Sequence, residues 1–128
     1  MDEMAKQLIG ILLQHPQIKL AILFGSQATG HARPTSDIDL AVLADQPINR
    51  YLKLELIEQV GFELGRAADI VDLHSAAEPL LGQVFKGKKL LGDNATYARL
   101  LTKHLLNTAD FLPLRERILK ERQAAWMQ

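Results

Sequence analysis

The first half of the chain carries two kinds of hydrophobic pattern. Apolar residues recur at helical spacing from Ala5 to Leu13, which predicts an amphipathic helix ending before Pro16, because proline disfavours helical backbone in the residue before it. The run over residues 18–24 reads IKLAILF and is almost continuously apolar, as expected of a buried strand. A second strand is predicted over residues 37–43. About a dozen loop residues separate the two strands, and loops of that length in a compact domain are usually functional.

The second half predicts further helices and strands around this pair. Asn49 is suited to cap a helix that runs to about Leu64, where Gly65 can supply the left-handed terminating residue. Beyond it the pattern predicts a strand, a helix, a small edge strand and a long helical segment, over residues 69–73, 76–85, 88–91 and 94–126. Pro113 interrupts the last segment and should kink or split it. This order of elements predicts an α/β or α+β fold, in which helices pack on a sheet.

Composition limits what such a domain can do. The chain has 128 residues, of which 48% are hydrophobic and 23% charged, and this suits one soluble globular domain. Lys+Arg and Asp+Glu both number 15, and a formal net charge of zero disfavours a protein whose main task is to coat nucleic acid. The absence of cysteine excludes disulfides, thiolate zinc sites and cysteine nucleophiles. We recognise no signal peptide, transit peptide or membrane-spanning run, so we expect a cytoplasmic protein without membrane contact.

Acidic residues are concentrated where the second predicted strand begins. Asp37 and Asp39 are two positions apart in an apolar strand, so their side chains should point to the same face, with Cα atoms about 6.6–6.8 Å apart. Two like charges in such positions are costly unless they are paired or bind a cation. Oxygen ligands favour a hard ion such as Mg²⁺, which prefers one or two carboxylates together with waters and substrate phosphates. The pair of aspartates therefore predicts a substrate that carries phosphate.

Gly25 and Ser26 supply the other half of this site. A glycine lets the backbone approach a phosphate closely, and the serine offers a hydroxyl and an N–H as donors. A two-metal site also needs a third carboxylate, which can help to deprotonate an attacking hydroxyl. We choose Asp72 in the third predicted strand, because Asp69 stands at the start of that strand, where a surface or turn position is the more common use.

These motifs resemble a known signature. Gly25-Ser26, ten intervening residues and then Asp37-Ile38-Asp39 are similar to the pattern of the DNA polymerase β-like nucleotidyltransferase superfamily. The short chain and the wording SDIDL resemble its minimal branch, the MNT-domain proteins that act as antitoxins beside HEPN-domain toxins. The clear match covers residues 18–43. The resemblance implies the polymerase β-like nucleotidyltransferase fold, with a small mixed β-sheet flanked by helices and a C-terminal helical extension.

The resemblance also implies an activity, which is transfer of a nucleoside monophosphate from a nucleoside triphosphate to a hydroxyl, with release of pyrophosphate. Carried over residue by residue, Asp37, Asp39 and Asp72 would be the catalytic carboxylates and would ligate two Mg²⁺ ions. Gly25 and Ser26 would bind the nucleotide. For an MNT antitoxin, the resemblance implies that ATP is the donor and that a tyrosine of the cognate HEPN toxin, the partner protein, receives AMP.

Two other hypotheses remain open. Many members of the superfamily carry arginine in the segment that here reads QAT over residues 27–29. Its absence favours slightly an antitoxin that is catalytically weak or inactive and neutralises its toxin by stoichiometric binding. The other hypothesis keeps the chemistry but transfers the nucleotide to a small-molecule or RNA acceptor. Zero net charge and the lack of an added substrate-binding domain count against this second alternative.

The chain is predicted to divide into a core and an extension. Residues 1–92 hold every candidate site residue and form the minimal nucleotidyltransferase core. Residues 93–128 form the C-terminal helical extension, whose later apolar residues exceed what a small core can cover. We expect this extension to pack on the core and to contact a partner.

Overall fold

The computed structural model describes residues 3–25 and 37–111, with side chains placed up to residue 106. Its helices and strands are, in chain order, α1 (Glu3–Leu13), β1 (Ile18–Phe24), β2 (Ile38–Ala44), α3 (Arg50–Leu64), β3 (Ala68–Asp72), α4 (Leu80–Phe85), β4 (Lys88–Leu91) and α5 (Asn94–Phe111). β1 and β4 have their predicted bounds, and β2 and β3 are displaced from theirs by a single residue. The predicted fold class, a sheet with helices packed on it, is confirmed.

The strands form one mixed sheet in the order β3-β2-β1-β4. β2 and β4 both run antiparallel to β1, whereas β3 runs parallel to β2. The parallel pair is connected through α3, because parallel neighbours need a crossover connection and cannot be joined by a tight turn. β3 and β4 are the edge strands. The register between β2 and β3 decides which acidic side chains lie next to each other.

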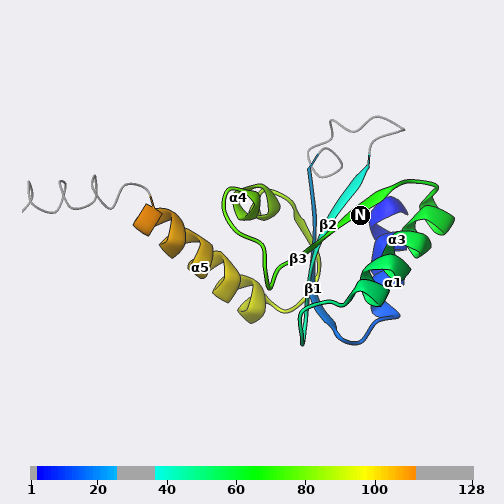
Figure 1. Cartoon of the computed structure of the whole chain (residues 1–128), viewed down its shortest axis with the longest axis horizontal. Coiled ribbons are helices and arrows are strands. Elements are labelled where there is room, and N and C mark those ends of the chain that lie inside the picture. The colour runs from blue at the N-terminus through cyan, green and yellow to red at the C-terminus, as the bar shows by residue number, and fades with distance from the viewer. Residues whose placement is uncertain (1–2, 26–36, 112–128) are drawn as a thin grey trace, which may run out of the picture. The chain divides into compact units, whose positions relative to one another are not determined.

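One face of the sheet packs against α1 and α3, which lie side by side in Figure 1. The strand residues that point to this face and form the core include Ile38, Leu40, Val42 and Ile70. The helix residues that meet them include Leu8, Leu12, Leu56 and Val60. Burial of these aliphatic side chains is the main source of stability in a domain of this kind.

The ends of α3 are formed by the residues that the sequence predicts. The side chain of Asn49 accepts a hydrogen bond from the backbone N–H of Leu52 at 2.8 Å, which satisfies one of the free donors of the first turn. Gly65 takes a left-handed φ of 65° and donates its N–H to the carbonyl of Gly61, which terminates the helix. The chain then turns directly into β3. The predicted cap at each end is therefore confirmed.

The opposite face of the sheet is covered in part by α4, which packs against β1 (Figure 1). Leu81 and Val84 of α4 are buried. The helix begins at Leu80 and not at residue 76 as predicted. Pro79 stands just before it and disfavours helical backbone in Glu78, which explains the later start.

The C-terminal part of the chain is a separate unit. The chain divides into Met1–Tyr97 and Ala98–Gln128, whereas the sequence predicts the boundary after residue 92. That boundary, and the predicted packing and partner contact of the extension, stay predictions. Pro113 and the helix predicted beyond it lie outside the described residues. In the part of the chain that the structure describes, no helix has the length and hydrophobicity needed to cross a membrane.

Candidate active site

Asp37 immediately precedes β2 and Asp39 is the second residue of that strand, and both lie on the face of the sheet opposite α1 and α3. Ile38 and Leu40 point into the core between the sheet and these helices, so the alternation of the strand directs both aspartates to the other face. Asp37 is exposed and Asp39 is half-buried. The structure thus brings the two carboxylates together on one face, as the sequence predicts.

A third carboxylate joins them from the neighbouring strand. In the parallel register of β2 and β3, Asp39 lies opposite Asp69. Residues that are opposite each other in adjacent strands point to the same face of a sheet. Asp69 is exposed and lies beside Asp39 on the face of the sheet that α1 and α3 do not cover, which we call the open face. Three aspartates from two strands are gathered at this end of the sheet.

The grouping has a clear electrostatic effect on Asp39. Burial raises the pKa of its carboxyl above the ordinary value, and the negative charges of Asp69 and then of Asp37 raise this pKa further. A bound cation would reverse the effect of the two neighbours, because an opposite charge favours the ionised form. The site is therefore suited to positive charge.

The donor set fits a metal that arrives with its substrate. Within residues 3–25 and 37–111, no three or more His, Asp or Glu side chains are close enough to hold a metal ion by themselves. Mg²⁺ does not require such a cage, since proteins usually bind it through one or two carboxylates together with waters and substrate phosphates. Asp37, Asp39 and Asp69 supply carboxylates of this kind on one open face.

Gly25 lies against the carboxylate of Asp39. It follows β1 directly, and the last residue of that strand, Phe24, is opposite Asp39 in the antiparallel register with β2. Gly25 has a φ of 76°, in the left-handed region, and a Cβ at this position would collide with Oδ2 of Asp39. Any other residue would strain the backbone and displace the carboxylate. Gly25 thus lies beside the aspartates, while Ser26, the other predicted nucleotide contact, lies outside the described residues.

Asp72 has different surroundings at the far end of β3. It is opposite Val42, a residue of the core beneath α1 and α3, so its side chain points to the covered face. Its carboxylate accepts a hydrogen bond from the backbone N–H of Ile48 at 3.1 Å and another from that of His74 at 2.9 Å. Asp72 therefore holds together the segments that follow β2 and β3.

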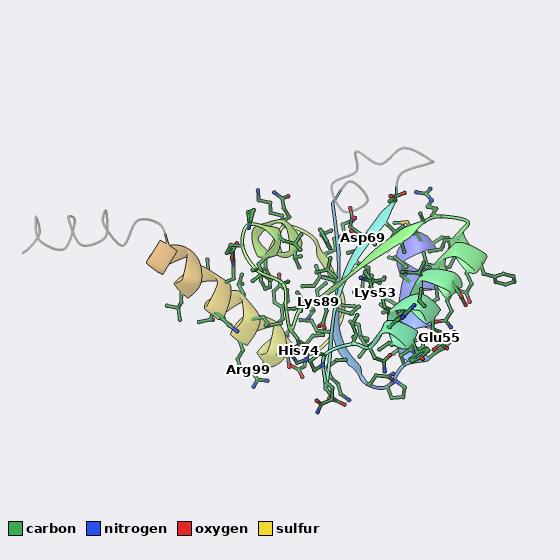
Figure 2. All side chains as sticks on the ribbon, in the orientation of Figure 1. Lys53, Glu55, Asp69, His74, Lys89 and Arg99 are labelled. Atoms are coloured by element: carbon green, nitrogen blue, oxygen red, sulfur yellow. The ribbon has the colours of Figure 1, made fainter. Side chains whose placement is uncertain are left out.

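This placement corrects the choice made from the sequence between the two aspartates of β3. Figure 2 shows Asp69 toward one end of the sheet and His74, just beyond Asp72, toward the other. The structure brings Asp69, and not Asp72, to Asp37 and Asp39. The sequence does show that Asp69 and Asp72 face opposite sides of their strand. It does not show the register with β2 that decides which of them joins the site.

Comparison with protein families is independent of this geometry. The family model described as "Polymerase beta, Nucleotidyltransferase" matches residues 6–96, a range that contains all the site residues described above. The protein adenylyltransferase MntA of Shewanella oneidensis is 40% identical to the chain over 78 residues. This match covers 60% of the chain and 56% of MntA, so the chain spans little more than half the length of that curated relative.

Solved structures extend the likeness. A chain in a crystal structure of a toxin-antitoxin with AMP-PNP is similar with a TM-score of 0.78 and 30% identity, and the match covers 93% of this chain and 98% of that one. A chain in a structure of tri-AMPylated Shewanella oneidensis HEPN toxin in complex with MNT antitoxin gives 0.72 and 28%, with 94% and 96% covered. These solved structures are aligned with a larger share of the chain than the family model is.

Proposed function

The chain belongs to the polymerase beta nucleotidyltransferase family, and from this we propose that it is a protein adenylyltransferase, the antitoxin that modifies a cognate HEPN toxin in the cytoplasm. It transfers AMP from ATP to a hydroxyl of the toxin, with tyrosine as the expected acceptor. The observation that carries the proposal is the group of three aspartates, Asp37, Asp39 and Asp69, on one sheet face beside Gly25. The names of the relatives support it, because they describe an adenylyltransferase, a complex with AMP-PNP and an AMPylated HEPN toxin.

The three aspartates are the residues that would hold two Mg²⁺ ions together with the triphosphate. When bound, the metal supplies positive charge that stabilises the charge developing around the α-phosphorus and favours ionisation of the attacking hydroxyl. Asp39 is held in place by its partial burial and by its contact with Gly25. Asp37, two residues earlier in the chain, and Asp69, opposite Asp39 in β3, are both exposed. The protein thus provides one fixed carboxylate and two accessible ones.

The accessible carboxylates determine how an acceptor can react. Asp69 is exposed on an edge strand, so a hydroxyl carried by another protein can approach it and give up its proton to it. The hydroxyl oxygen then forms a bond to the α-phosphorus, and the bond from that phosphorus to the oxygen bridging to the β-phosphate breaks. AMP stays on the acceptor and pyrophosphate leaves. Gly25 allows the backbone to approach the triphosphate, and Ser26 supplies donors to it.

Transfer of label tests the proposal. The chain is incubated with Mg²⁺, ATP labelled at the α-phosphate and the HEPN-domain protein that we expect to be encoded beside it. We expect label on the HEPN protein with the wild type and none with the Asp37→Asn/Asp39→Asn variant. Asp45→Asn is the matched control, because Asp45 is an exposed aspartate outside the site. Equal labelling by the double variant and the wild type would show that the proposed chemistry is wrong.

The same variants separate catalysis from masking. An antitoxin that only covers its toxin should still neutralise it after the double substitution, and should need equimolar amounts to do so. A catalytic antitoxin should act at substoichiometric amounts and lose this ability with the two aspartates. Transfer to RNA or to a small molecule would be recognised by label on that acceptor in place of the HEPN protein.

A further inference from the structure

The outward face of α3 carries large apolar side chains that the core does not use. Tyr51, Leu54 and Phe62 are 81%, 47% and 91% exposed. The residues of α3 that are buried in the core are Leu52, Leu56 and Val60. A helix that covers one side of a soluble domain normally turns polar residues outward, so an outer face of this composition indicates a further contact.

These exposed residues form a single stripe with acidic residues in it. At about 100° of rotation per helical residue, Tyr51, Leu54 and Phe62 lie within about 80° of one another. Glu58 falls between them and Glu55 lies at the edge, and both glutamates are exposed. Figure 2 shows Glu55 on the side of α3 that points away from the sheet. We call these five residues the outer stripe; it contains two negative charges and no positive one.

The C-terminal end of the outer stripe lies close to the edge strand β3, which carries Asp69. Phe62 is in the last turn of α3, and residues 65–67 connect that helix to β3, whose second residue is Asp69. Figure 1 shows α3 ending at the end of the sheet where β3 begins, and α3 packs against this edge strand. A protein that binds the outer stripe near Phe62 therefore lies beside the edge strand that carries Asp69. The carboxylate of Asp69 is on the face of the sheet opposite α3, so the segment that carries the acceptor hydroxyl reaches it around this edge.

We propose that the outer stripe is the docking surface for the protein that receives AMP. The inference rests on the proposed function, which makes this protein the HEPN toxin. Tyr51 and Phe62 are large aromatic anchors of the kind that carry most of the binding energy at interfaces. The partner surface has apolar residues opposite them and Lys or Arg opposite Glu55 and Glu58, because complementary charge selects the partner.

Charge also argues against a second copy of this chain as the occupant. In a two-fold contact the same patch meets itself, so the glutamates of one stripe would approach those of the other. Like charges placed across an interface are unfavourable, and the stripe has no lysine or arginine to compensate them. A partner of different sequence that carries Lys or Arg at the contact can form ion pairs with the same glutamates.

Binding measured without turnover tests the apolar part of the stripe. In the Asp37→Asn/Asp39→Asn background, the dissociation constant for the purified HEPN protein encoded beside this chain is measured by titration calorimetry. Phe62→Ser and Tyr51→Ser are each expected to raise it about tenfold or more. Leu13→Ser is the matched control, because Leu13 is 63% exposed on α1 and lies outside the stripe. Circular dichroism confirms that each variant is folded.

Charge reversal and kinetics test the acidic part. Glu58→Lys is expected to weaken binding at low salt more than at high salt, since screening already removes part of the attraction. Glu3→Lys, an exposed reversal in the first turn of α1, is the control. In multiple-turnover labelling with the intact active site, Phe62→Ser should raise the KM for the HEPN protein and leave kcat and the affinity for AMP-PNP unchanged.

The outcomes distinguish this inference from the proposed function. An unchanged dissociation constant for both Phe62→Ser and Tyr51→Ser overturns the inference. It is also overturned if these variants abolish self-association of the chain while the affinity for the HEPN protein stays the same. If the wild type labels nothing, yet both variants still weaken binding, the docking surface stands and the proposed activity fails.

Discussion

The two ends of β3 each carry an aspartate, and the two carboxylates meet opposite conditions. Asp69 is exposed beside Asp39, whose pKa it raises, and it adds negative charge to a site that already has two carboxylates. Asp72, three residues later, points to the covered face and accepts two backbone hydrogen bonds. The same residue type in one strand therefore has a structural role at Asp72 and, under the proposed function, a chemical role at Asp69.

Among the described residues, Asp72 has donors that stabilise its charge whereas Asp39 has neighbours that oppose its charge, and this contrast marks a candidate functional site. A buried or half-buried carboxylate normally has donors that stabilise its charge, as Asp72 has. The charges around Asp39 instead disfavour one another, which costs stability unless a ligand supplies positive charge. Such an arrangement is expected where the compensation comes from a substrate and its metal.

Substitution of each β3 aspartate by asparagine gives the largest expected contrast. Asp69→Asn removes the proposed proton acceptor and proposed metal ligand, so AMP transfer should fall about a hundredfold or more. Asp72→Asn keeps an oxygen that can accept a backbone hydrogen bond, and its transfer rate should stay close to that of the wild type. Initial rates of label transfer under saturating ATP provide the measurement. Full activity of Asp69→Asn, together with loss of activity in Asp72→Asn, would restore Asp72 as the third carboxylate.

Gly25 gives the next largest effect, because it sets the position of the fixed carboxylate. Gly25→Ala places a Cβ against Asp39 at a φ of 76°, so we expect transfer to fall about tenfold and the free energy of unfolding to fall by about 1 kcal/mol. Gly10→Ala is the matched control: Gly10 lies inside α1, and apart from its chain neighbours and the backbone of its own helix no described atom is within 4 Å of a Cβ there. It should gain about 0.5–1 kcal/mol and keep full activity. Similar behaviour of the two variants would contradict the account of Gly25.

Most of the fold follows from local patterns in the sequence. The apolar run of β1, the Asn49 and Gly65 ends of α3 and the short edge strand β4 depend on residues close together in the chain, and all three were predicted. The start of α4 was missed because the effect of Pro79 outweighed the apolar pattern around it. The shared face of Asp37 and Asp39 was also predictable, since it needs only the two-residue period of a strand.

The third carboxylate could not be predicted in the same way. The choice between Asp69 and Asp72 depends on the register of β3 against β2, a contact between segments about thirty residues apart that no local pattern determines. Both aspartates are flanked by apolar residues, so neither face of the strand is marked in the sequence as the covered one. Tertiary pairing, and not residue type, separates the two.

The effect on stability should be larger at Asp72 than at Asp69, which is the reverse of the expected effect on AMP transfer. Asp72→Ala removes the acceptor for the N–H groups of Ile48 and His74, so the free energy of unfolding should fall by about 1–3 kcal/mol. Asp69→Ala removes an exposed side chain that makes no hydrogen bond with the described residues, and it should change this free energy by less than about 0.5 kcal/mol. Urea denaturation followed by circular dichroism measures both. Equal losses would mean that Asp72 does not connect the two segments.

The smallest expected effect is that of Asp39→Asn on stability, and it is a gain, unlike the losses expected for Asp72→Ala and Gly25→Ala. Because folding raises the pKa of Asp39, the ionised carboxylate destabilises the folded chain; this cost is absent below the ordinary value of 3.8 and is fully present above the raised one. In EDTA at neutral pH, Asp39→Asn should therefore raise the melting temperature by about 2 °C, a gain that disappears in acid. Asp45→Asn should show no such gain, and Mg²⁺ with AMP-PNP should stabilise the wild type but not Asp39→Asn. A lower melting temperature for Asp39→Asn in EDTA would show that the three charges are already compensated within the protein.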